Sequence, residues 1–245
     1  WAPQTLNAFF TNDIASFAAK YTSLPAQISN RTHCIVWSDW ATQPKVELSY
    51  GIRLDENYYY WPPEWIQNRP GFMTGSGMPM RFADLDGSII DVYQAATQLT
   101  NETDDTSTSI NSMLDKALGP EGYYGVFGTH YNYTADNFST TILSSAQAHN
   151  VSLITAQQLL TWLDGRNSSS FHNSTWNGTQ LGFSITVGAG ANNLFAMIPN
   201  QTTGGHLSSL TINGASVSFT VQTIKGRSYA VFRAANGNAV ATYAP

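Results

Sequence analysis

The chain contains little cysteine and few charged residues, and each shortage excludes certain structural features or partners. Cys34 is its single cysteine, which excludes a disulfide within the chain and, at 245 residues, is neutral on the cellular compartment. Charged residues make up 11% of the sequence with a net charge of −5, and no basic patch stands out to bind nucleic acid. No apolar run approaches the roughly 18 residues that cross a bilayer as a helix. We therefore expect neither a nucleic-acid partner nor a membrane span.

Aromatic residues and glycosylation sequons are plentiful by contrast. Phe, Trp and Tyr make up 13% of the chain, which favours exposed rings that suit the CH faces of sugars, although core packing is the alternative for any single ring. Frequent Asn-X-Ser/Thr sequons predict a secreted, extracellular glycoprotein, unless they are an accident of a Ser/Thr-rich composition. The sequons lie at Asn30, Asn101, Asn132, Asn137, Asn150, Asn167, Asn173, Asn177 and Asn200.

The first two thirds of the chain alternate segments typical of helices with segments typical of strands. Helical spacing of apolar residues occurs at 5–21, 44–49, 107–118, 138–149 and 155–164. Apolar runs of strand length occur at 33–38, 51–60, 122–132 and 151–154. Asp86-Gly87, between two further runs, predicts a hairpin. Alternation of this kind favours an α/β fold with a parallel sheet or barrel.

The last third of the chain shows no helical pattern. Residues 167–178 are rich in Ser and Asn and are expected to form a linker. Beyond them, short alternating runs separated by Gly and Asn are typical of a small all-β sandwich. The sequence thus predicts two domains, an α/β domain at 1–168 and a β-sandwich at 176–245.

Polar side chains at the ends of predicted strands are the candidates for a pocket, since barrel enzymes build pockets from strand ends. Asp39 follows the run at 33–38. Asp55 leads into an aromatic stretch that includes Tyr59 and Trp61. A carboxylate beside aromatic rings can act as a general base, a metal ligand or an acceptor for sugar hydroxyls. The alternative for Asp55 is an ion pair with Arg53, which lies on the same face of its strand.

His130 ends the run at 122–132, where a histidine can act as a metal ligand or general acid, or can be hydrogen-bonded for structural reasons alone. Arg81 and Asp84 flank the predicted hairpin turn and are candidates for ligand contact. The sequence has no His-Glu-x-x-His zinc motif, no glycine-rich phosphate loop and no Gly-x-Ser-x-Gly elbow. The candidate chemistry therefore depends on carboxylates and on His130.

Several blocks of the chain together resemble a known family. The blocks are RTHCIVWSDW, GIRLDENYYYWP, RPGFMTGSGMPMRFADLDG and IDVYQAATQ, followed by GYYGVFGTH and SLITAQQLLTWLDGR. Over roughly residues 30 to 166 this set is similar to the C-terminal portion of secreted proteins related to polysaccharide deacetylases, a group of carbohydrate esterases.

The resemblance implies a distorted (β/α) barrel and a divalent metal such as zinc, held by one Asp and two His, that activates water against an N-acetyl or O-acetyl group. His130 matches the late histidine of that family, and Asp55 with the aromatic residues after it is similar to its later carboxylate motif. The strand with paired aspartates and the histidine pair at four-residue spacing are not recognisable here. No complete set of metal ligands can therefore be assigned.

Together these observations predict a secreted protein that removes acetyl groups from a polysaccharide. Its pocket is expected near Asp39, Asp55, Tyr59, Arg81 and His130. The alternative is a non-catalytic extracellular glycoprotein that binds glycans or forms filaments, with self-association through edge strands of the β-domain. The chain begins at Trp1 without a methionine, as expected after removal of a leader or for a piece of a longer protein.

Overall fold

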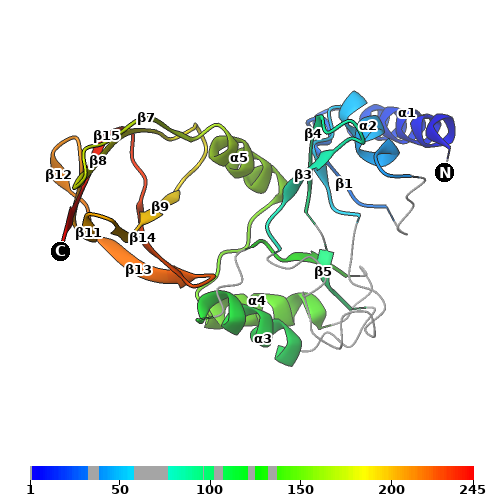
Figure 1. The fold of residues 1–245 in the computed structure, drawn as a ribbon. Coiled ribbons are helices and arrows are strands. Elements are labelled where there is room, and N and C mark those ends of the chain that lie inside the picture. Colours follow the sequence, from blue (N-terminus) through cyan, green and yellow to red (C-terminus); the bar gives the residue numbers. More distant parts are fainter. Residues whose placement is uncertain are drawn as a thin grey trace. The chain divides into compact units, whose positions relative to one another are not determined.

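The computed structural model describes residues 2–32, 39–57, 77–95, 97–101, 107–120, 125–131 and 137–245. The chain divides into two compact units, Trp1–Gln157 and Gln158–Pro245 (Figure 1). The sequence-based expectation placed the boundary near residue 170. Each unit has a hydrophobic core of its own.

Two helices open the first unit. Helix α1 (Pro3–Lys20) has proline in its first turn, where the missing N–H has no helical partner to lose, and it packs Leu6 and Phe10 against Ile52. Helix α2 (Thr42–Ser49) is shorter and carries the fully buried Glu47. The helices predicted at 5–21 and 44–49 are confirmed.

A four-stranded sheet follows, in the order β1 (Ser29–Asn30), β2 (Leu54–Asp55), β4 (Ile89–Gln94) and β3 (Met80–Ala83). β1, β2 and β4 run parallel, whereas β3 pairs with β4 in an antiparallel hairpin. Gly87 has a φ of 84° in its turn, and the Asp84 N–H donates to the Ser88 carbonyl at 2.8 Å. The predicted Asp86-Gly87 hairpin is therefore confirmed.

The remainder of the first unit joins a small parallel ladder to two helices. β5 (Thr97–Thr100) pairs with β6 (Gly128–His130), and α3 (Ser107–Leu118) and α4 (Phe138–Ala148) provide most of the apolar cluster beside it. Ile110, Met113 and Leu114 recur at helical spacing on the buried face of α3. This spacing explains why the helices at 107–118 and 138–149 were predictable.

The second unit contains two antiparallel sheets and α5 (Ala156–Asn167), which begins just before the boundary between the units. The larger sheet has the order β10 (Gln201–Thr202), β11 (Gly205–Ile212), β15 (Gly237–Ala244), β8 (Gln180–Thr186) and β7 (Ser170–Trp176), with β12 (Ala215–Ser216) paired to β11. The smaller sheet has the order β13 (Phe219–Ile224), β14 (Arg227–Arg233) and β9 (Phe195–Pro199).

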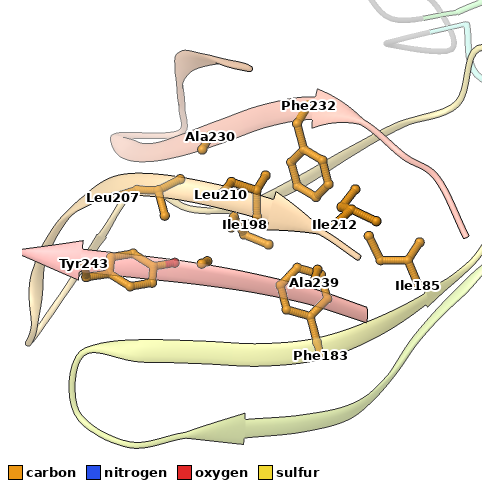
Figure 2. Packing of buried hydrophobic residues seen from close by; sticks show 11 residues of the cluster. Phe183, Ile185, Ile198, Leu207, Leu210, Ile212, Ala230, Phe232, Ala239 and Tyr243 are labelled. Atoms are coloured by element: carbon orange, nitrogen blue, oxygen red, sulfur yellow. The ribbon is translucent and has the colours of Figure 1, made fainter. Parts of the chain in front are cut away.

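Both sheets contribute alternate side chains to one apolar cluster (Figure 2). Phe183 and Leu210 come from the larger sheet and Phe232 from the smaller one, and all three are buried. Tyr243 on β15 is buried as well, and its hydroxyl donates to the Pro199 carbonyl on β9 at 2.8 Å. The two sheets are thus joined by packing and by a hydrogen bond between them.

The (β/α) barrel predicted for the first domain is wrong. The described residues are mostly β-structure in several sheets, largely antiparallel, with five helices among them. Parallel pairing is limited to β1–β2–β4 and β5–β6. A barrel needs a helical crossover between successive parallel strands, but β3, β4 and β5 follow one another with no helix between them.

Two local predictions are also wrong. Residues 151–154 form no strand, because the Val151 N–H donates to the Ala146 carbonyl and Asn150 takes a φ of 53° in the cap that ends α4. The expected linker at 167–178 contains strand β7, which pairs with β8. The predicted strand at 33–38 lies outside the described residues, as do 58–60 of the run at 51–60 and 122–124 and 132 of the run at 122–132. The described parts of these two runs contain the short strands β2 and β6.

Tyr243→Phe should lower the free energy of unfolding by about 1 kcal/mol, because it removes the hydroxyl that bonds the Pro199 carbonyl and leaves the packed ring in place. The shift of the urea unfolding midpoint measures this. Tyr131→Phe, at a half-exposed ring of the first unit, is the matched control. An equal shift in both variants would contradict a specific role for the Tyr243 hydroxyl.

Candidate functional site

Polar residues gather where the parallel strands of the first unit end. β1 ends at Asn30 and is followed by Arg31 and Thr32, while β2 ends at Asp55 and is followed by Glu56 and Asn57. β1 and β2 pair in register, Asn30 opposite Asp55, so their carboxyl ends meet at one sheet edge. Helix α2 brings Glu47 to the same place. We call Glu47, Asp55 and Glu56 the acid cluster.

Glu47 lies at the centre of a hydrogen-bond network, although it has no exposed surface. Its Oε1 atom accepts hydrogen bonds from Asn30 Nδ2 at 2.7 Å, Gln43 Nε2 at 2.8 Å and Asn57 Nδ2 at 3.3 Å. These three amides come from β1, from α2 itself and from the segment after β2. One carboxyl oxygen therefore ties three segments together.

Asp55 is equally buried and shares a partner with Glu47. Its two oxygens accept from the Asn57 backbone N–H at 3.0 Å and from Asn57 Nδ2 at 2.9 Å. The Asn57 side-chain oxygen accepts in turn from the hydroxyl of Thr32 at 2.8 Å and from its backbone N–H. Asn57 thus links both acids to the segment that follows β1.

The pKa shifts of the two buried acids favour one shared proton. Burial, together with the negative charge of Asp55, raises the pKa of Glu47 to about 9. Burial also raises the pKa of Asp55, although the hydrogen bonds from Asn57 oppose this. No donor from the described residues reaches Glu47 Oε2. A proton on Oε2 that is donated to Asp55 satisfies this atom, so Glu47 is neutral and Asp55 carries the charge.

Glu56 is the accessible member of the acid cluster. It is only half-buried, in contrast to Glu47 and Asp55. Burial raises the pKa of Glu56 and so does the charge of Asp55, whereas the Arg31 guanidinium lowers it. A carboxyl group that is partly exposed and has a raised pKa is suited to exchange protons with a bound molecule.

Sequence reasoning found Asp55 and missed its neighbours Glu47, Glu56 and Asn57. One signal was available in the segment Asp55-Glu56-Asn57, which follows a strand and places two acids and an amide at its end. Glu47 gave no such signal, because α2 has no apolar face that would indicate which residues are buried.

Asp39 lies apart from the acid cluster and is exposed. Its carboxylate accepts from the backbone N–H groups of Ala41 at 3.0 Å and Thr42 at 2.7 Å and from the Thr42 hydroxyl at 2.5 Å. These bonds lower the pKa of Asp39. The structure gives it the role of a cap for the first turn of α2.

Arg81 and Asp84 take part in surface ion pairs. Arg81 lies 3.6 Å from Asp91, and Asp84 pairs with Lys45, which lowers the pKa of that aspartate. Arg53 also pairs with Asp91, at 2.9 Å, and this is the ion pair that the structure shows in place of the Arg53–Asp55 alternative.

The other predicted pocket residues lie in a different sheet from Asp55 or outside the described residues. His130 ends β6 in the two-stranded sheet, whereas Asp55 lies in the four-stranded sheet. Tyr59 and Trp61 lie outside the described residues. Of the predicted catalytic set, the structure therefore places only Asp55 in the acid cluster.

The described residues do not fit the zinc site that the resemblance implies. Among them, no three His, Cys, Asp or Glu side chains lie close enough to hold a metal ion. Glu47 and Asp55 are already engaged by amide donors. His33 and Cys34 lie outside the described residues.

The sequons differ in their surroundings. Asn137, Asn150, Asn167, Asn173 and Asn177 are exposed, and Asn101 and Asn200 are half-buried. The Asn30 amide donates to Glu47, so a glycan on this nitrogen would conflict with the network. Asn132 lies outside the described residues.

In the part of the chain that the structure describes, no helix combines the length and the apolarity required to cross a membrane. Comparisons with models of protein families, with curated proteins and with solved structures find no match to the chain. The acid cluster is therefore interpreted from its own geometry and charge.

Glu47→Gln should flatten the pH dependence of stability while the first unit stays folded. The folded pKa of about 9 lies above the ordinary value of 4.5 that the carboxyl regains on unfolding. Between these values the unfolded chain binds fewer protons, so the free energy of unfolding falls as pH rises, by roughly 1 kcal/mol per pH unit. Glutamine keeps an oxygen for the amide donors and supplies an N–H to Asp55.

Urea unfolding measured from about pH 5 to about pH 9 tests this prediction. Asp13→Asn, at an exposed acid on α1, should leave the wild-type slope unchanged. Glu47→Ala should lower stability by about 3 kcal/mol, because it leaves buried amide donors without an acceptor. A wild-type stability that rises with pH over this range would show that Glu47 is ionised in the folded chain.

Proposed function

We propose that the chain is a secreted carbohydrate-active protein that hydrolyses acetyl groups on a glycan, with Glu56 as the acid and base. The observation that carries this proposal is the position of Glu56, a half-buried carboxyl beside a fully buried acid pair. Titratable groups pushed to different pKa values at the carboxyl ends of parallel strands are typical of sites of acid–base catalysis.

In the proposed reaction, Asp55 and Glu56 have different roles. Burial, together with the charge of Asp55, which Asn57 holds in place, raises the pKa of Glu56, and Arg31 opposes this. Ionised Glu56 accepts a proton from the water that attacks the acyl carbon. It then returns the proton to the amine or alcohol as the carbon–nitrogen or carbon–oxygen bond breaks, and acetate is released. We derive no step through a metal.

Two features beyond the acid cluster support a glycan outside the cell as the substrate. Five of the sequons lie at exposed asparagines, as N-glycosylation requires. Large aromatic rings are exposed as well, among them Trp40 in the first unit and Trp176 and Phe195 in the second. Exposed rings of this kind offer flat surfaces on which sugar rings can pack. The resemblance to polysaccharide deacetylases favours the same substrate class.

A second candidate function is non-catalytic glycan binding. The complete burial of Glu47 and Asp55 favours it, because a carboxyl group that no solvent reaches serves equally well to hold a strand edge together. On this interpretation Glu56 is a structural neighbour of the pair. The activity of a Glu56 variant therefore distinguishes the two functions.

Glu56→Gln should reduce acetate release from acetylated chito-oligosaccharides or acetylated xylan by about 100-fold or more, because glutamine cannot exchange the proton. Acetate is measured by an enzyme-coupled assay over a pH series, with and without a chelator of divalent ions. The wild-type profile should show an acidic group with a raised pKa that is missing from the variant.

Asp13→Asn again serves as the control and should retain full activity, since Asp13 is exposed on α1. Urea unfolding of Glu56→Gln checks that the variant is folded. Absence of acetate release by the wild-type chain on all these substrates, or equal activity of Glu56→Gln, would reject catalysis and leave the binding function.

A further inference from the structure

A hollow of about 360 Å³ lies in the second unit, lined by ends of β7, β8 and β9. β7 is an edge strand of the larger sheet and β9 an edge strand of the smaller one. The last turn of α5 adds Arg166 and Asn167 to the lining. The volume falls within the range of about 300 to 1,000 Å³ that is typical of small-molecule sites.

The apolar part of the hollow contains two exposed rings, the buried Ile185 and the smaller side chains of Leu194, Ala196 and Ala234. Phe171 on β7 is 49% exposed and Phe195 on β9 is 61% exposed, while Ile185 is buried. The Phe171 ring meets Phe183 edge-on at 5.2 Å, which fixes its position. Exposed rings at fixed positions suit the flat CH face of a pyranose.

Hydroxyl and amide groups occupy the rest of the lining. Ser169, Ser170, Thr186 and Asn167 supply donors and acceptors for sugar hydroxyls. The Ser169 hydroxyl donates to the Gly165 carbonyl at 2.8 Å and accepts from the Gly188 N–H at 2.9 Å, so its oxygen is held in place. Mixed apolar and polar lining of this kind is typical of saccharide sites.

Arg166 gives the hollow a positive charge in a chain whose net charge is −5. Its side chain is exposed and makes no ion pair with any residue that the structure describes. The described residues that line the hollow include no Asp and no Glu. A guanidinium group without an acidic neighbour is suited to bind a carboxylate through two parallel hydrogen bonds.

We propose that this hollow binds a saccharide that carries a carboxylate, such as a hexuronate residue within a glycan chain. Arg166 binds the carboxylate, the ring packs on Phe195, and the hydroxyl groups meet Ser170 and Thr186. The choice of a glycan as ligand rests on the proposed function, whereas the requirement for a carboxylate rests on the hollow alone. The second unit thereby selects acidic glycans for the chain.

Isothermal titration calorimetry of the full chain with trigalacturonate tests the proposal, and the methyl-esterified trisaccharide is the control for charge. We expect binding of the acid form and at least about tenfold weaker binding of the ester, because esterification removes the charge that Arg166 recognises. Binding should also weaken as the salt concentration rises. Equal affinity for both forms would overturn the role of the carboxylate.

Two variants locate the site. Arg166→Gln should weaken binding of trigalacturonate at least about tenfold, and Phe195→Ala about fivefold, because each removes one of the two main contacts. Arg227→Gln, at an exposed arginine in β14 that does not line the hollow, should bind like the wild type. Loss of binding in Arg227→Gln equal to that in Arg166→Gln would show general charge attraction and reject the site.

The remaining outcomes separate this proposal from the enzymatic one. A tripeptide of glutamate that binds as tightly as trigalacturonate would show that the hollow recognises carboxylates without a sugar, and would overturn the saccharide. Glu56→Gln should keep the wild-type affinity for trigalacturonate. No binding by a chain that releases acetate would reject the hollow alone, and binding by a chain that releases none would reject catalysis alone.

Discussion

The buried carboxyl group of Glu47 accepts hydrogen bonds from several amides. The arrangement of the carboxyl ends of β1 and β2 in the first unit depends on this group. β1 and β2 pair over only two residues each, so their backbone hydrogen bonds are too few to fix the sheet edge. Glu47 adds side-chain bonds from Asn30 and Asn57 across that edge. An unpaired charge at this depth would cost several kcal/mol, and the shared proton with Asp55 avoids one of the two charges.

The second unit is stabilised differently. Its sheets bury alternate apolar side chains on one core, and the hydrogen bond between Tyr243 and Pro199 joins two strands that belong to different sheets. Among the described residues β7 and β9 are edge strands, and they carry the exposed rings of Phe171, Trp176 and Phe195. The stability of this unit therefore comes from its apolar interior. The aromatic residues of the proposed ligand site lie on its edge strands.

Local sequence patterns were sufficient to predict many of the helices and strands. The fold depends on how strands that are distant in the sequence pair, and local patterns do not contain that information. Helix 107–118 was predictable from the spacing of Ile110, Met113 and Leu114, and the alternating runs after residue 180 became strands. Strand β7 was not predictable, because all its residues are exposed and only pairing with β8 orders them. The prediction of a (β/α) barrel was wrong for a related reason. The residues of an apolar run do not indicate whether the strand that pairs with it runs parallel or antiparallel. Glu47 was missed because its burial results from tertiary contacts.

The burial of each acid in the cluster determines whether it can contact a substrate directly. Glu47 and Asp55 have no exposed surface, so neither can touch a substrate, and their effect on one must pass through a neighbour. Glu56 is that neighbour, since it follows Asp55 in the chain, is half-exposed, and has a pKa raised by burial and by the Asp55 charge. The residue that sequence patterns favoured, Asp55, is on this argument a positioning residue. In the proposed reaction the proton is exchanged one residue further along, at Glu56, where the chain meets solvent.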